Sequence, residues 1–438
     1  MKILQIPYCY YPGPVGGTEV YVEALAAKIG ELGHTCVVVA PGKKTEEYFH
    51  EGIKVRRYAI SEGKCSLVDL YGMRDDKAVL EFAKILDDEK PDIVHMHALT
   101  RGASGELINE ATKRKIRIVF TYHTPTVSCQ RGTLLLFGKE VCDGKVEAKR
   151  CAACALNGLG LNTFLSRICS RVSGKIGKVV LNCKAPNFVK IPLGMRRLMD
   201  IRKNKFLLLM DKVDAIVAPR KWVKDLLLLN GVSLSKIHLL KQGLCRECNR
   251  DDQIPPEKED NTIRFVYMGR VDKTKGLDIF IKAFKQVDDN NITFDIYGIE
   301  QDNAKYFKKI KDLTATDKRI AIKESVQGKD VIKTLAGYDV LVVPSQWMET
   351  GPMVVLEAFA AGIPVIGSRL GGIAELIENE RNGLLVEPFS IKEWAKTIRR
   401  LSDNRNIIAK LKENVTPPNN MTKVACSAIE IYLDVFKK

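Results

Sequence analysis

VVPSQWMETGPMVVLEAFAAGIPVIGS, residues 342–368, is the stretch that decides the fold. Apolar runs at 340–343 and 364–367 predict two buried parallel strands, and the segment between them predicts a loop followed by a buried helix. Pro352 suits the first helical position, because the N–H that proline lacks would have no partner there. Strand, loop and helix in this order are typical of the carboxyl edge of a parallel sheet, where open α/β proteins bind ligands.

Two glutamates flank the start of this helix. Glu349 precedes it, and Glu357 lies within it. The free N–H groups near a helix start, here those of Thr350, Gly351 and Met353, favour an anion. We therefore expect both carboxylates and these N–H groups to face one ligand that crosses the helix N-terminus.

Length and composition indicate a globular protein of two domains with anionic partners. At 438 residues the chain is too long for one ordinary core. A net charge of +16 points to nucleic acid, an anionic membrane or phosphorylated substrates. The chain has no apolar run of about 18 residues and no signal-peptide pattern, so we expect a cytoplasmic protein with reduced thiols or a metal site.

Apolar runs alternate with amphipathic stretches along the chain, which predicts doubly wound α/β domains. In the first half the predicted strands are 2–6, 35–40, 54–58, 93–96 and 116–122, and the helices are 18–32 and 77–89. We assign 1–250 to a first domain, the proline-containing polar stretch 251–261 to a linker, and 262–420 to a second domain. The tail 421–438 has helical spacing and is expected to pack back on the first domain.

Glycines and cations stand where loops enter helices. Gly16 and Gly17 precede the first helix, with Thr18 as its candidate N-cap, and they would allow the close approach of a diphosphate; a flexible turn explains them equally well. Arg270 and Lys275 lie between a strand at 263–268 and a helix at 277–286. They could clamp a diphosphate, and the alternative is an ordinary surface charge pair.

Two histidines follow neighbouring predicted strands. His97 comes directly after 93–96, and His123 after 116–122. A single histidine at such a place is more often a structural hydrogen-bonding group. Two at adjacent strand ends favour a site, because neutral imidazole can bind sugar hydroxyls near pH 7.

Four cysteines mark a distinct segment at 127–155. Cys129, Cys142, Cys151 and Cys154 have the spacing Cys-x12-Cys-x8-Cys-x2-Cys. Four thiolates in this pattern could hold a structural zinc ion, and an iron–sulfur cluster is not excluded. The alternative is four reduced cysteines in a lid loop.

The stretch 160–206 is the most basic part of the chain. It contains eleven cations and one acid, a net charge of +10, interleaved with apolar residues. This composition is typical of an interfacial helix or hairpin that lies on anionic lipid. We see no nucleic-acid-binding motif, and a solvated basic face without a partner is the alternative.

Several of these motifs together resemble one enzyme family. They are GGTEVYV at 16–22, FTYHTPT at 120–126, GRVDKTKG at 269–276, ETGPMVVLE at 349–357, AAGIPVI at 360–366 and GGIAELI at 371–377. They resemble glycosyltransferase family 4, retaining enzymes of the GT-B fold. The resemblance implies two facing Rossmann-like, doubly wound domains with a central cleft.

The resemblance also implies roles for the residues that carry the phosphate chemistry. Gly16 and Gly17 would approach the diphosphate of a nucleotide-sugar donor, and Arg270 and Lys275 would neutralise it. Because these cations supply the charge, and because no Asp-x-Asp follows a strand, no catalytic metal is expected.

Three further roles concern the sugar. By the same resemblance Glu349 would meet the donor sugar hydroxyls, Glu357 the ribose, and His123 the transferred sugar.

The expected enzyme moves a sugar from a UDP- or GDP-sugar to a glycan or lipid-linked acceptor in cell-surface polysaccharide synthesis, on the inner face of the membrane. The alternatives are a nucleotide-sugar epimerase on the same fold and a catalytically silent membrane scaffold.

Overall fold

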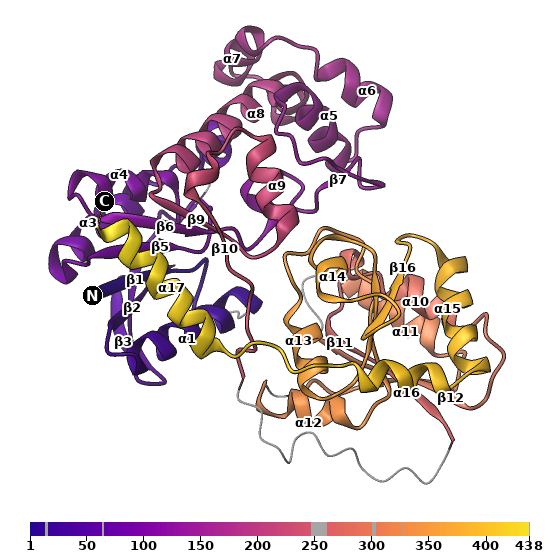
Figure 1. Ribbon diagram of the computed structural model, residues 1–438. Helices are drawn as coiled ribbons and strands as arrows, with labels where there is room; N and C mark the ends of the chain where they lie inside the picture. The colour runs from indigo at the N-terminus through magenta and orange to yellow at the C-terminus, as the bar shows by residue number, and fades with distance from the viewer. Residues whose placement is uncertain (14–15, 64, 247–260, 300–303, 327, 438) are drawn as a thin grey trace. The chain divides into compact units, whose positions relative to one another are not determined.

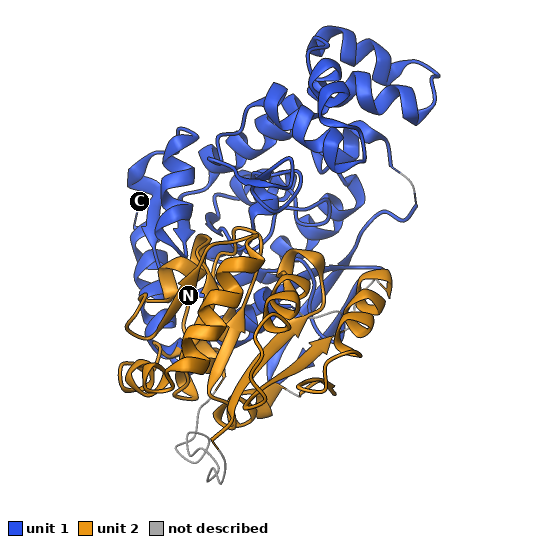
Figure 2. Ribbon diagram, turned by 90° about the vertical axis from the view of Figure 1, so that its right-hand side faces the viewer, with its two compact units in different colours: residues 1–241, 421–438 blue, residues 242–420 orange. Residues whose placement is uncertain are grey.

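The computed structural model describes the chain except for residues 14–15, 64, 247–260, 300–303, 327 and 438, and it contains two compact units. The first unit comprises residues 1–241 and 421–438, and the second comprises 242–420 (Figure 2). The second unit thus begins earlier than the predicted boundary after residue 250. The reason is local: the Leu244 N–H donates to the Asn419 carbonyl at 2.7 Å, which ties this stretch to the end of the second unit. The predicted linker, apart from Asn261, lies outside the described residues.

The first unit is built on an eight-stranded sheet of order β10-β9-β6-β5-β1-β2-β4-β3, parallel except at the β3 edge. Its strands are β1 (Lys2–Ile6), β2 (Thr35–Gly42), β3 (Glu46–His50), β4 (Ile53–Ala59), β5 (Ile93–Met96), β6 (Arg117–Thr121), β9 (Ala215–Ala218) and β10 (Ile237–Leu239). Its helices outside the segment between β6 and β9 are α1 (Gly17–Glu31), α2 (Leu67–Gly72), α3 (Asp76–Glu89), α4 (Gly105–Lys113), α9 (Lys221–Leu229) and α17 (Met421–Phe436). The central strands β5 and β9 are buried along their whole length, as expected when helices cover both faces of a parallel sheet.

The second unit is built on a six-stranded parallel sheet of order β13-β12-β11-β14-β15-β16. Its strands are β11 (Ile263–Arg270), β12 (Ile292–Ile299), β13 (Ile320–Lys323), β14 (Val340–Val343), β15 (Val365–Ser368) and β16 (Gly383–Val386). Its helices are α10 (Leu277–Phe284), α11 (Ala304–Thr314), α12 (Val331–Ala336), α13 (Met353–Ala360), α14 (Gly371–Leu376), α15 (Ile391–Asp403) and α16 (Asn406–Glu413). A short turn, η4 (Lys273–Lys275), joins β11 to α10.

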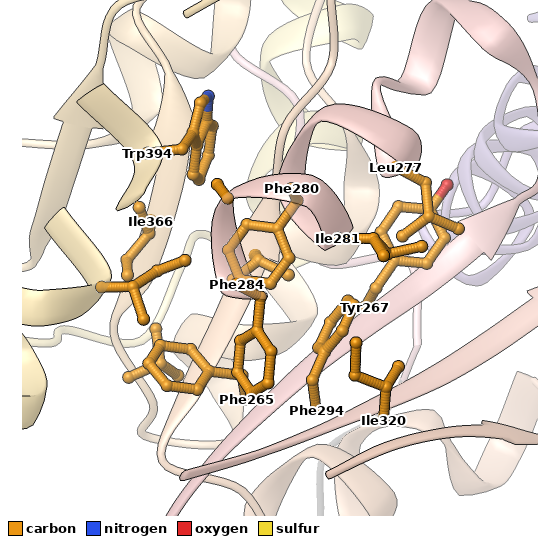
Figure 3. Packing of buried hydrophobic residues seen from close by; sticks show 14 of the residues in the cluster. Phe265, Tyr267, Leu277, Phe280, Ile281, Phe284, Phe294, Ile320, Ile366 and Trp394 are labelled. Carbon is orange, nitrogen blue, oxygen red and sulfur yellow. The ribbon is translucent and has the colours of Figure 1, made fainter. Parts of the chain in front are cut away.

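An aromatic cluster fixes α10 on this sheet (Figure 3). The Phe280 ring lies with its centroid 4.7 Å from that of Phe294 on β12 and 5.5 Å from that of Trp394 on α15. Both neighbours meet Phe280 edge to face, an arrangement that aromatic pairs prefer. The start of α10, and the loop that leads into it, are therefore held firmly relative to the strands.

Both sheets reverse their strand order at one point. In the second unit the chain runs from β11 outward to β13, and then returns to place β14 on the other side of β11. In the first unit the corresponding reversal lies between β1 and β5. Loops that leave the carboxyl ends of the two strands at such a reversal diverge and leave room for a ligand.

We call the segment between β6 and β9 the insert. It contains a small antiparallel pair, β7 (Leu135–Leu136) and β8 (Glu140–Val141), and four helices: α5 (Ala148–Gly158), α6 (Thr163–Cys169), α7 (Gly174–Asn182) and α8 (Asn187–Lys212). Figure 1 shows them gathered beside the sheet, with α6 and α7 at the end of α8 that lies away from the strands. The sequence predicted an interfacial helix or a hairpin here, and the structure has three separate helices within 163–212. Among the described residues, no helix is long and apolar enough to cross a bilayer.

Candidate active site

The strongest candidate site lies where the loops after β11 and β14 meet, at the strand reversal of the second unit. Lys275 ends the first loop, and its Nζ lies 2.9 Å from Glu349 Oε1 on the second. Their side chains are 17% and 7% exposed, so the pair is shielded from most of the solvent. The sequence predicted that these two residues serve one ligand, and the structure brings them together.

Backbone contacts hold the two loops in register. Gly276 has φ +67°, and a Cβ added there would lie 2.0 Å from the Pro344 carbonyl oxygen. The Gln346 N–H donates to the Thr274 carbonyl at 2.6 Å. Because only glycine tolerates both the left-handed backbone and this close approach, Gly276 sets the distance between the loops.

Residues of the loop after β14 orient Glu349. The Ser345 hydroxyl donates to the same Oε1 that meets Lys275. The Trp347 ring lies with its centroid 5.7 Å from Lys275 Nζ, within the range of a cation–π contact. Sequence reasoning missed Ser345, Gln346 and Trp347. The available signal was their place between the end of a buried strand and Glu349.

The start of α13 differs in detail from the prediction. Pro352 is the N-cap, and the helix begins at Met353. Thr350 and Gly351 therefore belong to the preceding loop, and of the three predicted N–H groups only that of Met353 lies in the first helical turn. Gly372 packs against this loop: its N–H donates to the Glu349 carbonyl at 2.6 Å, and an added Cβ would lie 2.6 Å from the Thr350 carbonyl carbon.

Glu357 lies one turn into α13 and is 5% exposed. Its carboxylate pairs with the Arg246 guanidinium, a partner that sequence reasoning did not find. Burial raises the pKa of Glu357, and the charge of Arg246 opposes that shift. The arginine partner therefore offsets part of the cost of burying this carboxylate.

Arg270 ends β11 with an exposed side chain. The Tyr267 hydroxyl donates to the Arg270 carbonyl at 2.6 Å and fixes the backbone there. Burial and the charge of Glu349 raise the pKa of Tyr267, whereas Arg270 lowers it. The charges of Arg270 and Glu349 thus act on the same buried phenol in opposite directions.

The two predicted histidines meet in the first unit. His97 Nδ1 lies 2.8 Å from His123 Nε2, and His97 Nε2 lies 2.6 Å from Gln5 Oε1. His95 joins the group through a ring centroid 4.0 Å from that of His97 and a 2.6 Å contact from its Nδ1 to the Tyr432 hydroxyl of α17. Burial lowers the pKa of His95 and His123 to about 3 and that of His97 well below its ordinary value. All three imidazoles are therefore neutral at pH 7.

The N-terminus of α1 lies at the same sheet edge. The helix begins at Gly17 and its N-cap is Gly16, so the prediction of Thr18 as the cap is wrong. The Glu19 carboxylate caps the helix by accepting the Gly16 N–H at 2.9 Å, which suits the positive end of the helix dipole. Gly16, Gly17 and His123 belong to the first unit and the predicted donor residues to the second, and each set is placed within its own unit.

The four predicted metal ligands line one pocket of the first unit. All four thiols are free, and the Phe137 N–H donates to Cys154 Sγ at 3.2 Å. As the described side chains stand, no three His, Cys, Asp or Glu groups are arranged to hold a metal ion. The assignment of Cys129, Cys142, Cys151 and Cys154 to a metal remains a prediction.

Comparison with known proteins gives two family matches. The family described as "Glycosyl transferases group 1" matches residues 249–416, and "Glycosyltransferase Family 4" matches residues 15–140. The matches cover parts of both units, including Gly16, His123 and the whole Lys275–Glu357 region.

Curated relatives are more distant. An "Uncharacterized 42.6 kDa protein in cps region" of Klebsiella pneumoniae is 25% identical over 396 residues, which is 86% of this chain and 87% of that protein. The "UDP-Gal:alpha-D-GlcNAc-diphosphoundecaprenol alpha-1,3-galactosyltransferase" of Escherichia coli is 27% identical over 180 residues, 40% of this chain and 46% of that enzyme. The chain therefore spans less than half the length of this second relative.

Solved structures share the fold across the whole chain. Anabaena Alr3699/HepE in complex with UDP and glucose superposes with a TM-score of 0.63 at 15% identity, covering 99% of this chain and 100% of that one. The lipopolysaccharide outer core galactosyltransferase WaaB superposes with a TM-score of 0.61 at 16% identity, covering 98% and 99%. At these identities the likeness concerns the fold.

Proposed function

Because the chain belongs to glycosyltransferase family 4 and has the GT-B fold, we propose that it transfers a sugar, with retention, from a UDP- or GDP-sugar to a glycan or lipid-linked acceptor. One observation carries this proposal: the shielded Lys275–Glu349 pair at the strand reversal of the second unit. It provides a fixed cation and a fixed acceptor of hydroxyl hydrogen bonds side by side, as a sugar diphosphate requires.

Lys275 is the proposed stabiliser of the leaving group, with Arg270 beside it. When the bond between sugar and diphosphate breaks, negative charge grows on the leaving phosphate oxygens. A cation that is already in place stabilises that charge more in the transition state than in the ground state. The Gly276 contact and the bond from Gln346 to Thr274 support this role, because they fix the loop before any ligand arrives.

The two glutamates are proposed to recognise the donor through hydrogen bonds. Glu349 would accept hydrogen bonds from the sugar hydroxyls, and Glu357 from the ribose. Acid–base catalysis by the pair is disfavoured, because each carboxylate is already engaged in an ion pair with a basic side chain of the same unit. We assign His123, as a neutral imidazole, to the transferred sugar.

The names of relatives support the acceptor class. The Escherichia coli relative is named for transfer to a sugar on diphosphoundecaprenol, and the WaaB structure for the lipopolysaccharide outer core. We propose that this chain likewise acts in cell-surface polysaccharide synthesis, in the cytoplasm and peripherally on the inner face of the membrane. Donor base, donor sugar and linkage are left to experiment.

Release of nucleoside diphosphate tests the proposal. Each candidate donor is incubated with the full-length enzyme, with and without a lipid extract as acceptor source. Lys275→Ala should lower kcat/KM by about 10²–10³, the typical loss of one fixed electrostatic group. Lys273→Ala, an exposed lysine two positions earlier in the same turn, is the matched control and should keep the wild-type rate.

Two results would contradict the assignment. Lys275→Ala with the wild-type rate would remove Lys275 from the site. Donor consumption that does not depend on acceptor, with the sugar changed but not transferred, would instead indicate an epimerase. We also expect turnover to persist in EDTA, because Arg270 and Lys275 supply the charge that a catalytic metal would otherwise provide.

A further inference from the structure

Large apolar side chains of the insert point into solvent. Phe164 and Phe188 are 73% and 79% exposed, and Val179 and Ile176 are 71% and 56% exposed. We call these four, with Leu165 and Ile168, the insert's apolar face. All six lie on three consecutive helices within residues 164–188, and large exposed apolar residues that gather in one part of a surface point to a site of interaction.

Helix packing explains why these residues point outward. On α7, Gly177 is buried against α8, where an added Cβ would lie 3.0 Å from the Cβ of Arg197. Ile176 and Val179 are three positions apart and share a face of α7 that differs from the face of Gly177, and both are exposed. On α6 the buried residue is Ser166, whereas Phe164 is exposed. A helix that packs on its own protein normally buries its large apolar residues and exposes its polar ones, and α6 does the opposite at these two positions.

The apolar face is surrounded by unneutralised positive charge. Residues 163–190 contain six cations, and no Asp or Glu occurs between Glu147 and Asp200. Arg171, Lys175, Lys178 and Lys184 are exposed, and within the described part of the chain no salt bridge to them is formed. Apolar side chains flanked by cations, without acids, complement the interface of a bilayer that contains anionic lipid.

We propose that the insert's apolar face docks the enzyme on an anionic lipid bilayer. Phe164, Val179 and Phe188 enter the interfacial layer, and Lys175 and Lys178 meet the headgroup phosphates. The proposal deepens the proposed function and rests on it for its purpose, since a lipid-linked acceptor lies in such a membrane. The docking itself needs no donor and can be measured without turnover.

Flotation with vesicles tests the docking. The full-length protein is mixed with vesicles of phosphatidylcholine alone, or of phosphatidylcholine with phosphatidylglycerol, at low and high salt. We expect it to float only with phosphatidylglycerol and less at high salt, because the attraction is partly electrostatic. Lys175→Gln/Lys178→Gln should weaken binding by about fivefold for each charge removed. Phe164→Ser/Phe188→Ser should weaken it at least tenfold.

Matched controls lie on the opposite edge of the same unit's sheet. Phe49, on β3, is 70% exposed, and Lys43 is exposed nearby. Phe49→Ser and Lys43→Gln should float like the wild type. Binding that ignores lipid charge, or binding unchanged in both insert variants, overturns the proposal. A third result also overturns it: the wild type is a dimer without lipid, and Phe164→Ser/Phe188→Ser is a monomer. The apolar face would then join two copies of the chain.

The test separates this inference from the proposed function. If flotation fails while donor turnover persists, only the docking surface is wrong. If flotation succeeds while no nucleotide sugar is bound or consumed, the proposed function fails and the surface stands. The insert variants should keep donor hydrolysis in the absence of lipid, because none of their residues lies in the second unit.

Discussion

Lys275 is held by several neighbours at once. Its ammonium group lies 2.9 Å from Glu349 Oε1 and 5.7 Å from the Trp347 ring centroid. In the proposed function, a donor diphosphate would share this cation with Glu349 and so free part of the carboxylate for the sugar hydroxyls. Phosphate binding and sugar recognition would then be linked through one ion pair.

A double-mutant cycle measures this link in the free enzyme. Lys275→Met leaves the Glu349 carboxylate, 7% exposed, without its cation, and should destabilise the fold by about 2–4 kcal/mol. Glu349→Gln in addition should restore part of that loss, because no unpaired charge is then buried. Urea unfolding of the wild type, of Lys275→Met and Glu349→Gln alone, and of the double variant gives the coupling energy. Strict additivity would mean that the pair does not interact in solution.

The neutral histidines predict a pH dependence of stability. Burial holds the pKa of His95 and His123 at about 3, below the ordinary value near 6.5. Between about pH 3 and pH 6.5 the unfolded chain therefore binds more protons than the folded chain. Their contribution to stability is complete above about pH 6.5 and is lost as the pH falls toward 3. His95→Gln should flatten the slope by up to about 1.4 kcal/mol per pH unit. Urea midpoints across this range check it, and an unchanged slope would contradict the burial argument.

At the scale of elements, the parallel strands are the most predictable part of the fold. The run Val340–Val343 is continuously apolar because both faces of the strand are covered, and the structure has a strand at those residues. The edge strand β3 could not be predicted, since its sequence EEYFH is mostly polar and its place depends on antiparallel pairing with β4.

The candidate site also has parts that the sequence predicts and parts that it does not. The Lys275–Glu349 region could be predicted because strand ends and glycines mark it locally. Arg246 could not, because its ion pair with Glu357 joins residues 111 positions apart and no local pattern signals it. The capping of α1 by Glu19 was also missed, because glycine at an N-cap leaves the capping group to another residue.

Two glycines of the second unit form a matched pair for testing the loop contact. Gly276 and Gly362 both have a left-handed backbone, with φ +67° and +73°, but an added Cβ at Gly362 meets nothing within 4 Å. Alanine at either position should cost about 1–3 kcal/mol of stability through backbone strain, and at Gly276 the clash with the Pro344 carbonyl adds to this cost. Only Gly276→Ala should also lower turnover, by at least tenfold, because it pushes the two loops apart. Equal turnover in both variants would show that the loop spacing is unimportant.

We propose that the four-cysteine segment binds one structural zinc ion. Cys129, Cys142, Cys151 and Cys154 line one cavity together with Arg150, whose charge would offset part of that of a tetrathiolate. The thiols would have to draw together around the ion. Metal analysis should find about one zinc per chain, lost in Cys151→Ser/Cys154→Ser and kept in the exposed control Cys183→Ser. A stoichiometry near zero in the wild type would end the idea.

At the scale of the whole molecule, each unit brings its own chemistry to the carboxyl edge of its own sheet. The first unit holds neutral imidazoles and the α1 N-terminus, and the second holds the ion pairs of Glu349 and Glu357. The surplus positive charge is concentrated outside both edges, in the insert. The proposed functions divide in the same way: donor binding is assigned to the second unit, and membrane docking to the first.

Binding of nucleotide sugars tests the central claim most directly. Thermal unfolding of the wild type, Lys275→Ala and the control Lys273→Ala is followed with UDP-, GDP- and ADP-sugars in turn. A true donor at about 100 times its Kd should stabilise the wild type and Lys273→Ala by about 2.7 kcal/mol. Lys275→Ala should gain much less at the same concentration. A chain that no nucleotide sugar stabilises, or a donor that stabilises Lys275→Ala as strongly as the wild type, would contradict the account.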